Sequence, residues 1–402
     1  MSAEQTRILI YSHDTFGLGH LRRCRAIAHA LAEGNSTNSI LILSGSPIIG
    51  SFDFRAQVDF VRVPGVIKLR NGDYTSLGLH IDIEHTLELR AEIIEHTART
   101  FRPDIFIVDK EPLGLRGEVG QTLDMLHGFG TRNILGLRDV LDAPDVLVEE
   151  WDRKQAYSAI ESLYDDVWIY GLNSIYDPLT ALPLSDNARN KVTYTGYLRR
   201  FLPRQEVFEP SAYNEDEPFI LVTPGGGGDG IELVDWVMRA YETQLSPLFP
   251  ALIALGPFMA AEQRRHFFER AERLRNVRVI RFTPDIEALM DQATAVVGMG
   301  GYNTFCEVLS FDKPALLVPR IVPRREQAIR ADRAEAAGLI KQLPIDHYPN
   351  VELMTNALAE LPLQPKPSEA GITHLLDGLD VINAKVRSIV GSSKTTLRAA
   401  NE

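Results

Sequence analysis

His20 is the residue of this 402-residue chain whose type and position best suit proton transfer. It follows the apolar run RILIYS and a glycine turn, and apolar residues at helical spacing begin directly after it. An imidazole titrates near neutral pH, and a helix N-terminus lowers its pKa, so a neutral His20 could act as a general base. A lone histidine is usually structural, and the adjacent Arg22 and Arg23 could either bind an anion or coat the helix. The assignment therefore depends on what surrounds His20.

Three acidic residues follow other apolar runs and are further candidates for catalysis. Asp109 and Glu111 stand at the end of DIFIVD, and Asp139 follows NILGLR. The carboxyl ends of parallel strands face a common crevice, where such groups would meet a substrate. Each could equally be a loop carboxylate with ordinary hydrogen bonds, or could bind a substrate rather than take part in the reaction.

Three glycine-rich turns could hold phosphate groups, because glycine lets an anion approach backbone N–H groups at the start of a helix. Their glycines are Gly17 and Gly19; Gly225, Gly226, Gly227 and Gly228; and Gly300 and Gly301. The first turn has Arg22 where a dinucleotide fingerprint needs a small residue, and the second lacks the Lys-Ser or Lys-Thr of a P-loop. A phosphate site of another kind is expected, with a flexible turn as the alternative.

Glu307 lies one turn into the helix that should follow the third glycine turn. It is spaced i+4 from Asn303 and i+3 from Thr304, so the three side chains share one helix face. A carboxylate there could accept two hydrogen bonds from the vicinal diol of a ribose. The alternative is a solvated acid on the helix surface.

The elements that must position these residues follow an alternating pattern. Short β-branched apolar runs alternate with helical segments in two series, separated by a stretch rich in proline and mixed charges near residues 197–217. We predict an α/β architecture with two Rossmann-like domains, each built on a parallel sheet. The expected boundaries are an N-terminal domain over 1–200, a linker over 201–217, a C-terminal domain over 218–367, and a last helix over 368–391 that could pack back on the N-terminal domain.

Composition and charge exclude several functions. Lys and Arg total 42 against 54 Asp and Glu, a net charge of −12 that disfavours nucleic acid as a partner. The two cysteines, Cys24 and Cys306, lie far apart, which argues against a disulfide framework and favours a reducing, cytoplasmic location. There is no apolar run of about 18 residues, so any membrane contact would be peripheral. No two aspartates are spaced i, i+2, so we expect no metal, and no cofactor is implied.

The segment from Phe282 to Arg330 resembles the donor-binding region of glycosyltransferase family 28, which includes the peptidoglycan N-acetylglucosaminyltransferase. The shared features are a glycine-rich turn, a Phe-x-x-Asp segment, a Gly-Gly pair followed by Glu, a Pro-x-x-x-x-Pro segment and a Gln. The resemblance implies that Gly225–Gly228 approach the donor diphosphate, that backbone near Phe282 meets the base, and that Glu307 binds the ribose. Gln327 would reach the sugar, and Arg330 replaces an asparagine of the family.

The resemblance implies a GT-B architecture, in which the parallel sheets of the two Rossmann-like domains face a central cleft, with an acceptor domain over 1–200 and a nucleotide-sugar donor domain over 218–367. It also implies inverting, metal-independent transfer from a nucleotide-diphospho-sugar, with uridine as the family's nucleoside, to an unknown glycan, lipid-linked or small-molecule acceptor. Residues 61–78 could form an acceptor or membrane-surface loop. The string GLGHLRRCRAIAHAL is also similar to nucleotide-sugar hydrolases of the pseudaminic acid pathway, which share the GT-B architecture and use the loop histidine on water. A hydrolase or epimerase, or a non-catalytic sugar-nucleotide-binding protein, therefore remain alternatives.

Overall fold

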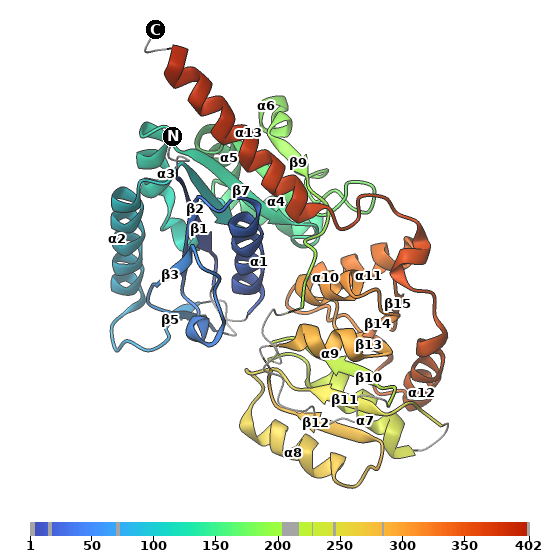
Figure 1. The fold of residues 1–402 in the computed structure, drawn as a ribbon. Helices are drawn as coiled ribbons and strands as arrows, with labels where there is room; N and C mark the ends of the chain where they lie inside the picture. The colour runs from blue at the N-terminus through green and yellow to red at the C-terminus, as the bar shows by residue number, and fades with distance from the viewer. Residues whose placement is uncertain are drawn as a thin grey trace. The chain divides into compact units, whose positions relative to one another are not determined.

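The structure is a computed structural model that describes residues 5–14, 18–69, 73–202, 217–226, 228–243, 247–283 and 285–399. The chain divides into two compact units, Met1–Leu198 together with Leu375–Glu402 (unit 1) and Arg199–His374 (unit 2). Each unit contains one parallel sheet flanked by helices (Figure 1). Gly17, Gly227 and most of the expected linker, residues 203–216, lie outside the described residues.

Unit 1 is built on a seven-stranded parallel sheet in the order β3-β2-β1-β6-β7-β8-β9. The strands are β1 (Thr6–Ser12), β2 (Asn38–Ser44), β3 (Val58–Arg62), β6 (Ile105–Asp109), β7 (Arg132–Arg138), β8 (Asp166–Tyr170) and β9 (Val192–Tyr194). The strand order reverses between β1 and β6, where open α/β sheets bind ligands. Tyr11 of β1 lies beside Val108 of β6, so the residues that follow these strands leave the sheet next to one another.

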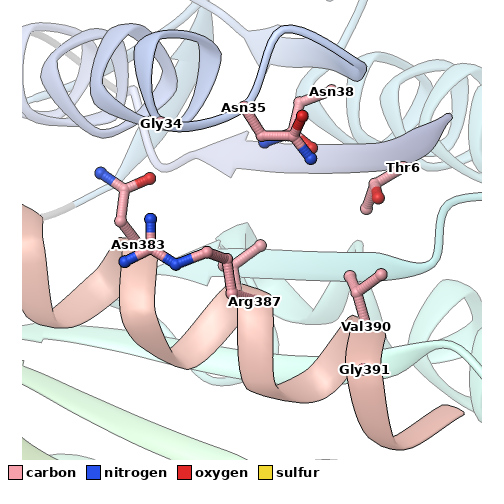
Figure 2. A pocket seen from close by; sticks show the side chains of 9 residues that line it. Thr6, Gly34, Asn35, Asn38, Asn383, Arg387, Val390 and Gly391 are labelled. Carbon is pink, nitrogen blue, oxygen red and sulfur yellow. The ribbon is translucent and has the colours of Figure 1, made fainter. Parts of the chain in front are cut away.

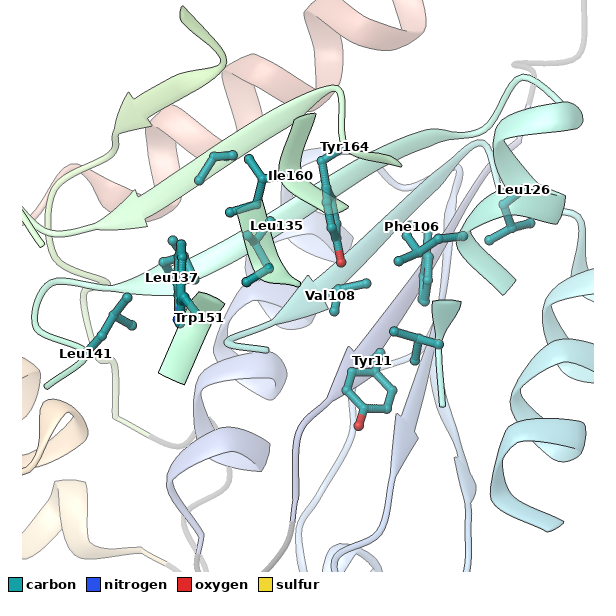
Figure 3. Packing of buried hydrophobic residues seen from close by; sticks show 14 of the residues in the cluster. Tyr11, Phe106, Val108, Leu126, Leu135, Leu137, Leu141, Trp151, Ile160 and Tyr164 are labelled. Carbon is teal, nitrogen blue, oxygen red and sulfur yellow. The ribbon is translucent and has the colours of Figure 1, made fainter. Parts of the chain in front are cut away.

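Helices cover this sheet because their apolar residues recur at helical spacing. They are α1 (Gly19–Gly34), α2 (Ile83–Phe101), α3 (Gly120–Gly128), α4 (Pro144–Arg153), α5 (Ala156–Leu163) and α6 (Asp186–Asn190). The expected inner face of α1, with Leu21, Cys24, Ala28 and Leu31, is buried. Figure 3 shows side chains of β6 and β7 packing with those of the following helices in one apolar core. A small antiparallel hairpin, β4 (Val66–Lys68) and β5 (Tyr74–Ser76), lies in the stretch considered as an acceptor loop.

Unit 2 repeats the plan with a six-stranded parallel sheet in the order β12-β11-β10-β13-β14-β15. The strands are β10 (Ile220–Thr223), β11 (Ala251–Ala254), β12 (Val277–Ile280), β13 (Ala295–Gly298), β14 (Ala315–Leu317) and β15 (Lys341–Gln342). The helices are α7 (Ile231–Thr243), α8 (Ala261–Ala271), α9 (Ile286–Gln292), α10 (Tyr302–Ser310), α11 (Glu326–Ala336) and α12 (Val351–Glu360). The order reverses between β10 and β13, and a glycine turn follows each of these two strands.

The C-terminal helix α13 (Gly378–Ala399) belongs to unit 1 (Figure 1). Asn383 Nδ2 donates a hydrogen bond from this helix to the carbonyl of Ala30 at 3.2 Å. The expected start at residue 368 is wrong. Residues Pro367–Ala370 form a 3₁₀ turn that ends at Gly371, whose φ of +65° is left-handed, and His374 also has a positive φ of 62°. Left-handed residues interrupt an α-helix, so α13 begins only after them.

Candidate functional site

His20, Asp109 and Arg23 form a buried cluster at the switch point of the unit 1 sheet. The Nδ1 atom of His20 lies 2.5 Å from Oδ2 of Asp109. Arg23, which is 1% exposed, donates to Oδ1 of the same carboxylate from Nε at 2.8 Å and from Nη2 at 2.6 Å. Arg23 Nη2 also lies 3.0 Å from Nδ1 of His20, but the Asp109 oxygen is nearer and can only accept. We therefore infer that His20 donates through Nδ1 and keeps the lone pair of Nε2. The His20 side chain is 19% exposed, so this ring can meet a ligand.

The electrostatics of the cluster keep the imidazole neutral and the carboxylate ionised. Desolvation by burial lowers the pKa of His20 to about 4, although the charge of Asp109 opposes the change. Burial would raise the pKa of Asp109, but Arg23 and then His20 outweigh it and hold this pKa below its ordinary range. At neutral pH, His20 is therefore an unprotonated base whose orientation is set by an anion.

Asp14, in the loop after β1, is hydrogen-bonded to the end of β2 and to the start of α1. Its Oδ2 accepts a hydrogen bond from the Ser44 hydroxyl at 2.6 Å, and its Oδ1 accepts one from the backbone N–H of Leu21 at 3.2 Å. Burial raises the pKa of Asp14 to about 6, while its hydrogen bonds act in the opposite direction. Asp14 thus ties the end of β2 to the first turn of α1, directly beside His20.

A second buried chain of polar groups ends at His13, beside His20. Arg90 donates to Glu118 from Nε at 2.7 Å and from Nη2 at 2.6 Å, and also binds the Pro64 carbonyl. The hydroxyl of Tyr11 donates to Glu118 at 2.6 Å and lies 3.4 Å from Nδ1 of His13. Because the Tyr11 proton is directed at the carboxylate, we infer that His13 donates through Nδ1. The sequence interpretation missed His13, whose position one residue past β1 was the available signal.

The other two acidic candidates of unit 1 have partners of their own. Glu111 accepts from Lys154 Nζ at 2.8 Å and lies 3.2 Å from Lys110 Nζ. Burial acts to raise its pKa, but Lys110 and other nearby cations bring it well below the usual range. Asp139 is buried and accepts from the N–H of Val140 at 2.7 Å. Of the three strand-end acids, Asp109 is the one bonded to His20, and roles for Glu111 and Asp139 stay predictions.

In unit 2, the third glycine turn leads into α10 as expected. Gly300 has a φ of +78°, a left-handed conformation that favours glycine, and α10 starts two residues later at Tyr302. Asn303, Thr304 and Glu307 are all buried on α10. Glu307 is 1% exposed, so it is not the solvated surface acid that the sequence left open.

Arg200 adds a buried cation near the start of α10. Its Nη2 donates to Oδ1 of Asn303 at 2.7 Å, its N–H donates to the Ser310 hydroxyl at 2.9 Å, and the residue is only 6% exposed. No acidic side chain among the described residues forms an ion pair with it. The sequence interpretation missed Arg200, because it placed this residue at the boundary between the first domain and the linker.

Except for Gly19, the remaining predicted donor residues that the structure describes lie in unit 2. Gly225, with a φ of +71°, and Gly226 follow β10, and Gly228 precedes α7. Gln327 is buried, with Oε1 accepting from the N–H of Arg320 at 3.2 Å. Arg330 Nη1 donates to the carbonyl of Gly300 at 2.8 Å and so supports the third glycine turn. Phe282 follows β12 and is half-buried, and Gly19, at the start of α1 in unit 1, is exposed.

A pocket of about 210 Å³ lies elsewhere in unit 1, between the end of α1 and α13 (Figure 2). Thr6, Asn38, Asn383 and Arg387 are among the residues that line it. Thr6 begins β1, whereas His13 and Asp14 follow its other end, so the pocket is not part of the His20 cluster. Across the described residues, no three His, Cys, Asp or Glu side chains are arranged to hold a metal ion, and no helix is long and apolar enough to cross a membrane.

Comparison with known proteins finds similarity to glycosyltransferases. Residues 226–341 match the glycosyltransferase family 28 C-terminal domain. An uncharacterized glycosyltransferase of Methanosarcina acetivorans is 24% identical over 343 residues, which cover 84% of this chain and 86% of the relative. The calicheamicin glycosyltransferase CalG4 has a similar structure, with a TM-score of 0.59 and 14% identity over 96% of this chain and 99% of that one.

A second solved structure, LpCGTa in complex with UDP, has a TM-score of 0.62 at 13% identity, covering 96% of this chain and 99% of that one. The fold is that of the GT-B glycosyltransferases. The α/β architecture with two Rossmann-like domains is thereby confirmed. The domain match, the relative and the structural neighbours together support a glycosyltransferase.

Proposed function

We propose that this protein transfers a sugar from a UDP-sugar to a hydroxyl group of an acceptor, with inversion at the anomeric carbon and without a metal. The observation that carries the proposal is the hydrogen bond between His20 and Asp109, because it orients a neutral imidazole as a base. The family 28 match supports a donor site in unit 2, and LpCGTa with bound UDP supports uridine as the nucleoside of the donor.

His20 would act on the acceptor hydroxyl. Nε2 takes the proton while the acceptor oxygen forms a bond to the anomeric carbon, and the bond from that carbon to the phosphate oxygen breaks. The electron pair of the broken bond leaves with UDP. Asp109 stabilises the imidazolium that forms, as an ionised carboxylate beside a histidine does in other proton-transfer sites. Arg23 keeps Asp109 ionised and therefore positions it rather than touching the acceptor.

Unit 2 would hold the donor. The glycine turns after β10 and β13 offer backbone N–H groups to the diphosphate, and the buried Arg200 at α10 supplies positive charge for it. Glu307 would accept the ribose hydroxyls, and Gln327 would contact the sugar. These assignments rest on the family resemblance together with the burial of the side chains near α10.

Hydrolysis of the nucleotide sugar is the second candidate function, because the same base could activate water instead of an acceptor hydroxyl. The acceptor itself is a glycan, a lipid-linked compound or a small molecule in this proposal. Cys24 and Cys306 are buried thiols that form no disulfide, which supports a reducing location such as the cytoplasm.

The deciding experiment follows UDP release from a panel of UDP-sugars, with and without an extract that supplies acceptors. A transferase should release UDP slowly in water and much faster with the extract, and the anomeric configuration of the product, read by NMR, should be opposite to that of the donor. Rapid release without extract would replace the transferase with the hydrolase. No turnover under either condition, despite UDP binding, would favour a binding protein.

A further inference from the structure

Arg320 joins the glycine-rich loop of unit 2 to the start of α11. Its Nε lies 2.6 Å from Oδ2 of Asp229, which stands two residues before α7 in the loop after β10. Its Nη2 donates to Oε1 of Glu326 at 2.7 Å, and its Nη1 donates to the carbonyl of Arg324 at 3.1 Å. One guanidinium is therefore shared between two carboxylates on different segments.

The loop that carries Asp229 is the segment through which the donor diphosphate would be bound. The two ends of this loop lie close together, because a Cβ at Gly230 would lie 2.1 Å from Cβ of Pro224. The carbonyl of Gly226 accepts from the N–H of Phe258 at 3.1 Å, which holds the loop to its neighbour. A carboxylate on a loop that also receives phosphate groups repels them unless a cation lies between, and Arg320 is the cation that contacts this carboxylate.

The two carboxylates bound to Arg320 differ in how easily they can leave it. The side chain of Glu326 is 5% exposed, so releasing it would strand a buried charge. The side chain of Asp229 is 50% exposed and can be solvated in place, so its ion pair with Arg320 is weak. The side chain of Arg320 is 19% exposed, so an anion can reach it. An incoming anion could therefore displace Asp229 but not Glu326.

We propose that Asp229 and the phosphate groups of the nucleotide sugar compete for Arg320. The inference rests on the proposed donor site in unit 2 and deepens it. Asp229 acts as an internal anion that holds Arg320 and the loop in place, and the diphosphate takes over the guanidinium when it binds. Glu326 keeps Arg320 directed at the loop throughout.

Competition predicts effects of opposite sign for the two partners. Asp229→Asn removes the internal anion and should tighten UDP binding about two- to fivefold, the range expected for loss of an exposed ion pair. Arg320→Gln should weaken UDP binding about tenfold or more, since hydrogen bonds to charged groups are lost. Uridine carries no phosphate, so neither substitution should change its affinity.

The test is calorimetric titration of the full-length wild type and both variants with UDP, UMP and uridine, and of the wild type also with GDP and dTDP. Arg265→Gln, which removes an exposed cation of α8, is the matched control and should leave UDP binding unchanged. Asp229→Asn should increase the affinity for UDP less when Arg320→Gln is also present than when it is introduced alone. Arg320→Lys, which keeps the charge, should recover part of the affinity, and circular dichroism checks the fold of each variant.

Weaker UDP binding in both single variants would mean that the ion pair only shapes the loop, and would overturn the competition. Unchanged binding in both would remove Arg320 and Asp229 from the site, as would an equal effect on uridine. A wild type that binds none of the nucleoside diphosphates would instead overturn the proposed donor site, and the competition with it.

Discussion

The imidazole rings of His13 and His20 meet edge to face, with centroids 5.6 Å apart and an interplanar angle of 76°. Each ring ends a buried polar chain that runs through a carboxylate to an arginine. The chain of His20 passes through Asp109, and that of His13 passes through Tyr11 and Glu118. In both, Nδ1 is the atom bound to the chain, so both Nε2 atoms are left as acceptors.

The first prediction concerns these tautomers. We expect both histidines to carry their proton on Nδ1 at neutral pH, because each Nδ1 faces a group that accepts it. Long-range ¹H–¹⁵N correlation spectra of the ring nitrogens report the tautomer directly, with Tyr11→Phe as the variant that frees His13 and leaves His20 as an internal control. A protonated Nε2 on His20 in the wild type would contradict the assignment of this ring as base.

A second prediction concerns turnover. His20→Ala should reduce kcat by about 10² to 10⁴ fold and leave UDP affinity nearly intact, because general-base catalysis is lost while the donor site is separate. Asp109→Asn should reduce kcat by about 10² fold or more, since the amide no longer stabilises an imidazolium. Steady-state rates and UDP titrations of the same preparations check both. Full activity in His20→Ala would move the base to Asp109, Glu111 or Asp139.

A third prediction follows from the pKa of His20, which is about 4 in the folded protein against 6.5 as the ordinary value. The folded state binds fewer protons than the unfolded state between these values, so the free energy of unfolding falls as the pH drops from about 6.5 to 4. The full shift corresponds to about 3 kcal/mol. Urea unfolding of the wild type and His20→Asn across this range measures it. Parallel pH curves for the two proteins would mean that His20 titrates normally.

Glu307 provides a fourth prediction, on binding. Glu307→Gln should weaken UDP binding by about 1.5 to 3 kcal/mol, the usual contribution of hydrogen bonds to a charged group. The isosteric amide is chosen because Glu307 is buried and an alanine would leave a cavity. Titration with 2′-deoxy-UDP sharpens the test: the wild type should lose affinity for it, and Glu307→Gln should lose less. Equal losses in both proteins would place Glu307 away from the ribose.

The last prediction tests how α13 joins unit 1. A Cβ at Gly378 would lie 2.6 Å from the carbonyl oxygen of Gly196 and 2.7 Å from that of Tyr197, both backbone atoms. Gly378→Ala should therefore lower the free energy of unfolding by about 1 to 3 kcal/mol. Gly391→Ala, on the same helix and with open space around it, is the control and should be neutral or slightly stabilising. Equal thermal midpoints for the two variants would argue against this docking.

Much of the fold could be predicted from the sequence because its cues are local. The runs RILIYS, DIFIVD and FILVTP became β1, β6 and β10, and the apolar spacing after His20 became α1. The order of these elements predicted two Rossmann-like halves, and the resemblance to glycosyltransferase family 28 implied the GT-B architecture. The edge strands β3 and β9 were missed, since short, partly exposed strands show little apolar pattern.

The sequence by itself determined which residues stand at strand ends and glycine turns, and so nominated His20, Asp109 and Glu307. Only the tertiary structure decided their partners. His20 and Asp109 are 89 positions apart and meet because β1 and β6 are neighbours in the sheet. Arg23, which from sequence could have coated a helix, is buried against Asp109 for the same reason. Side-chain partners depend on strand order, and strand order depends on contacts between segments that no local pattern records.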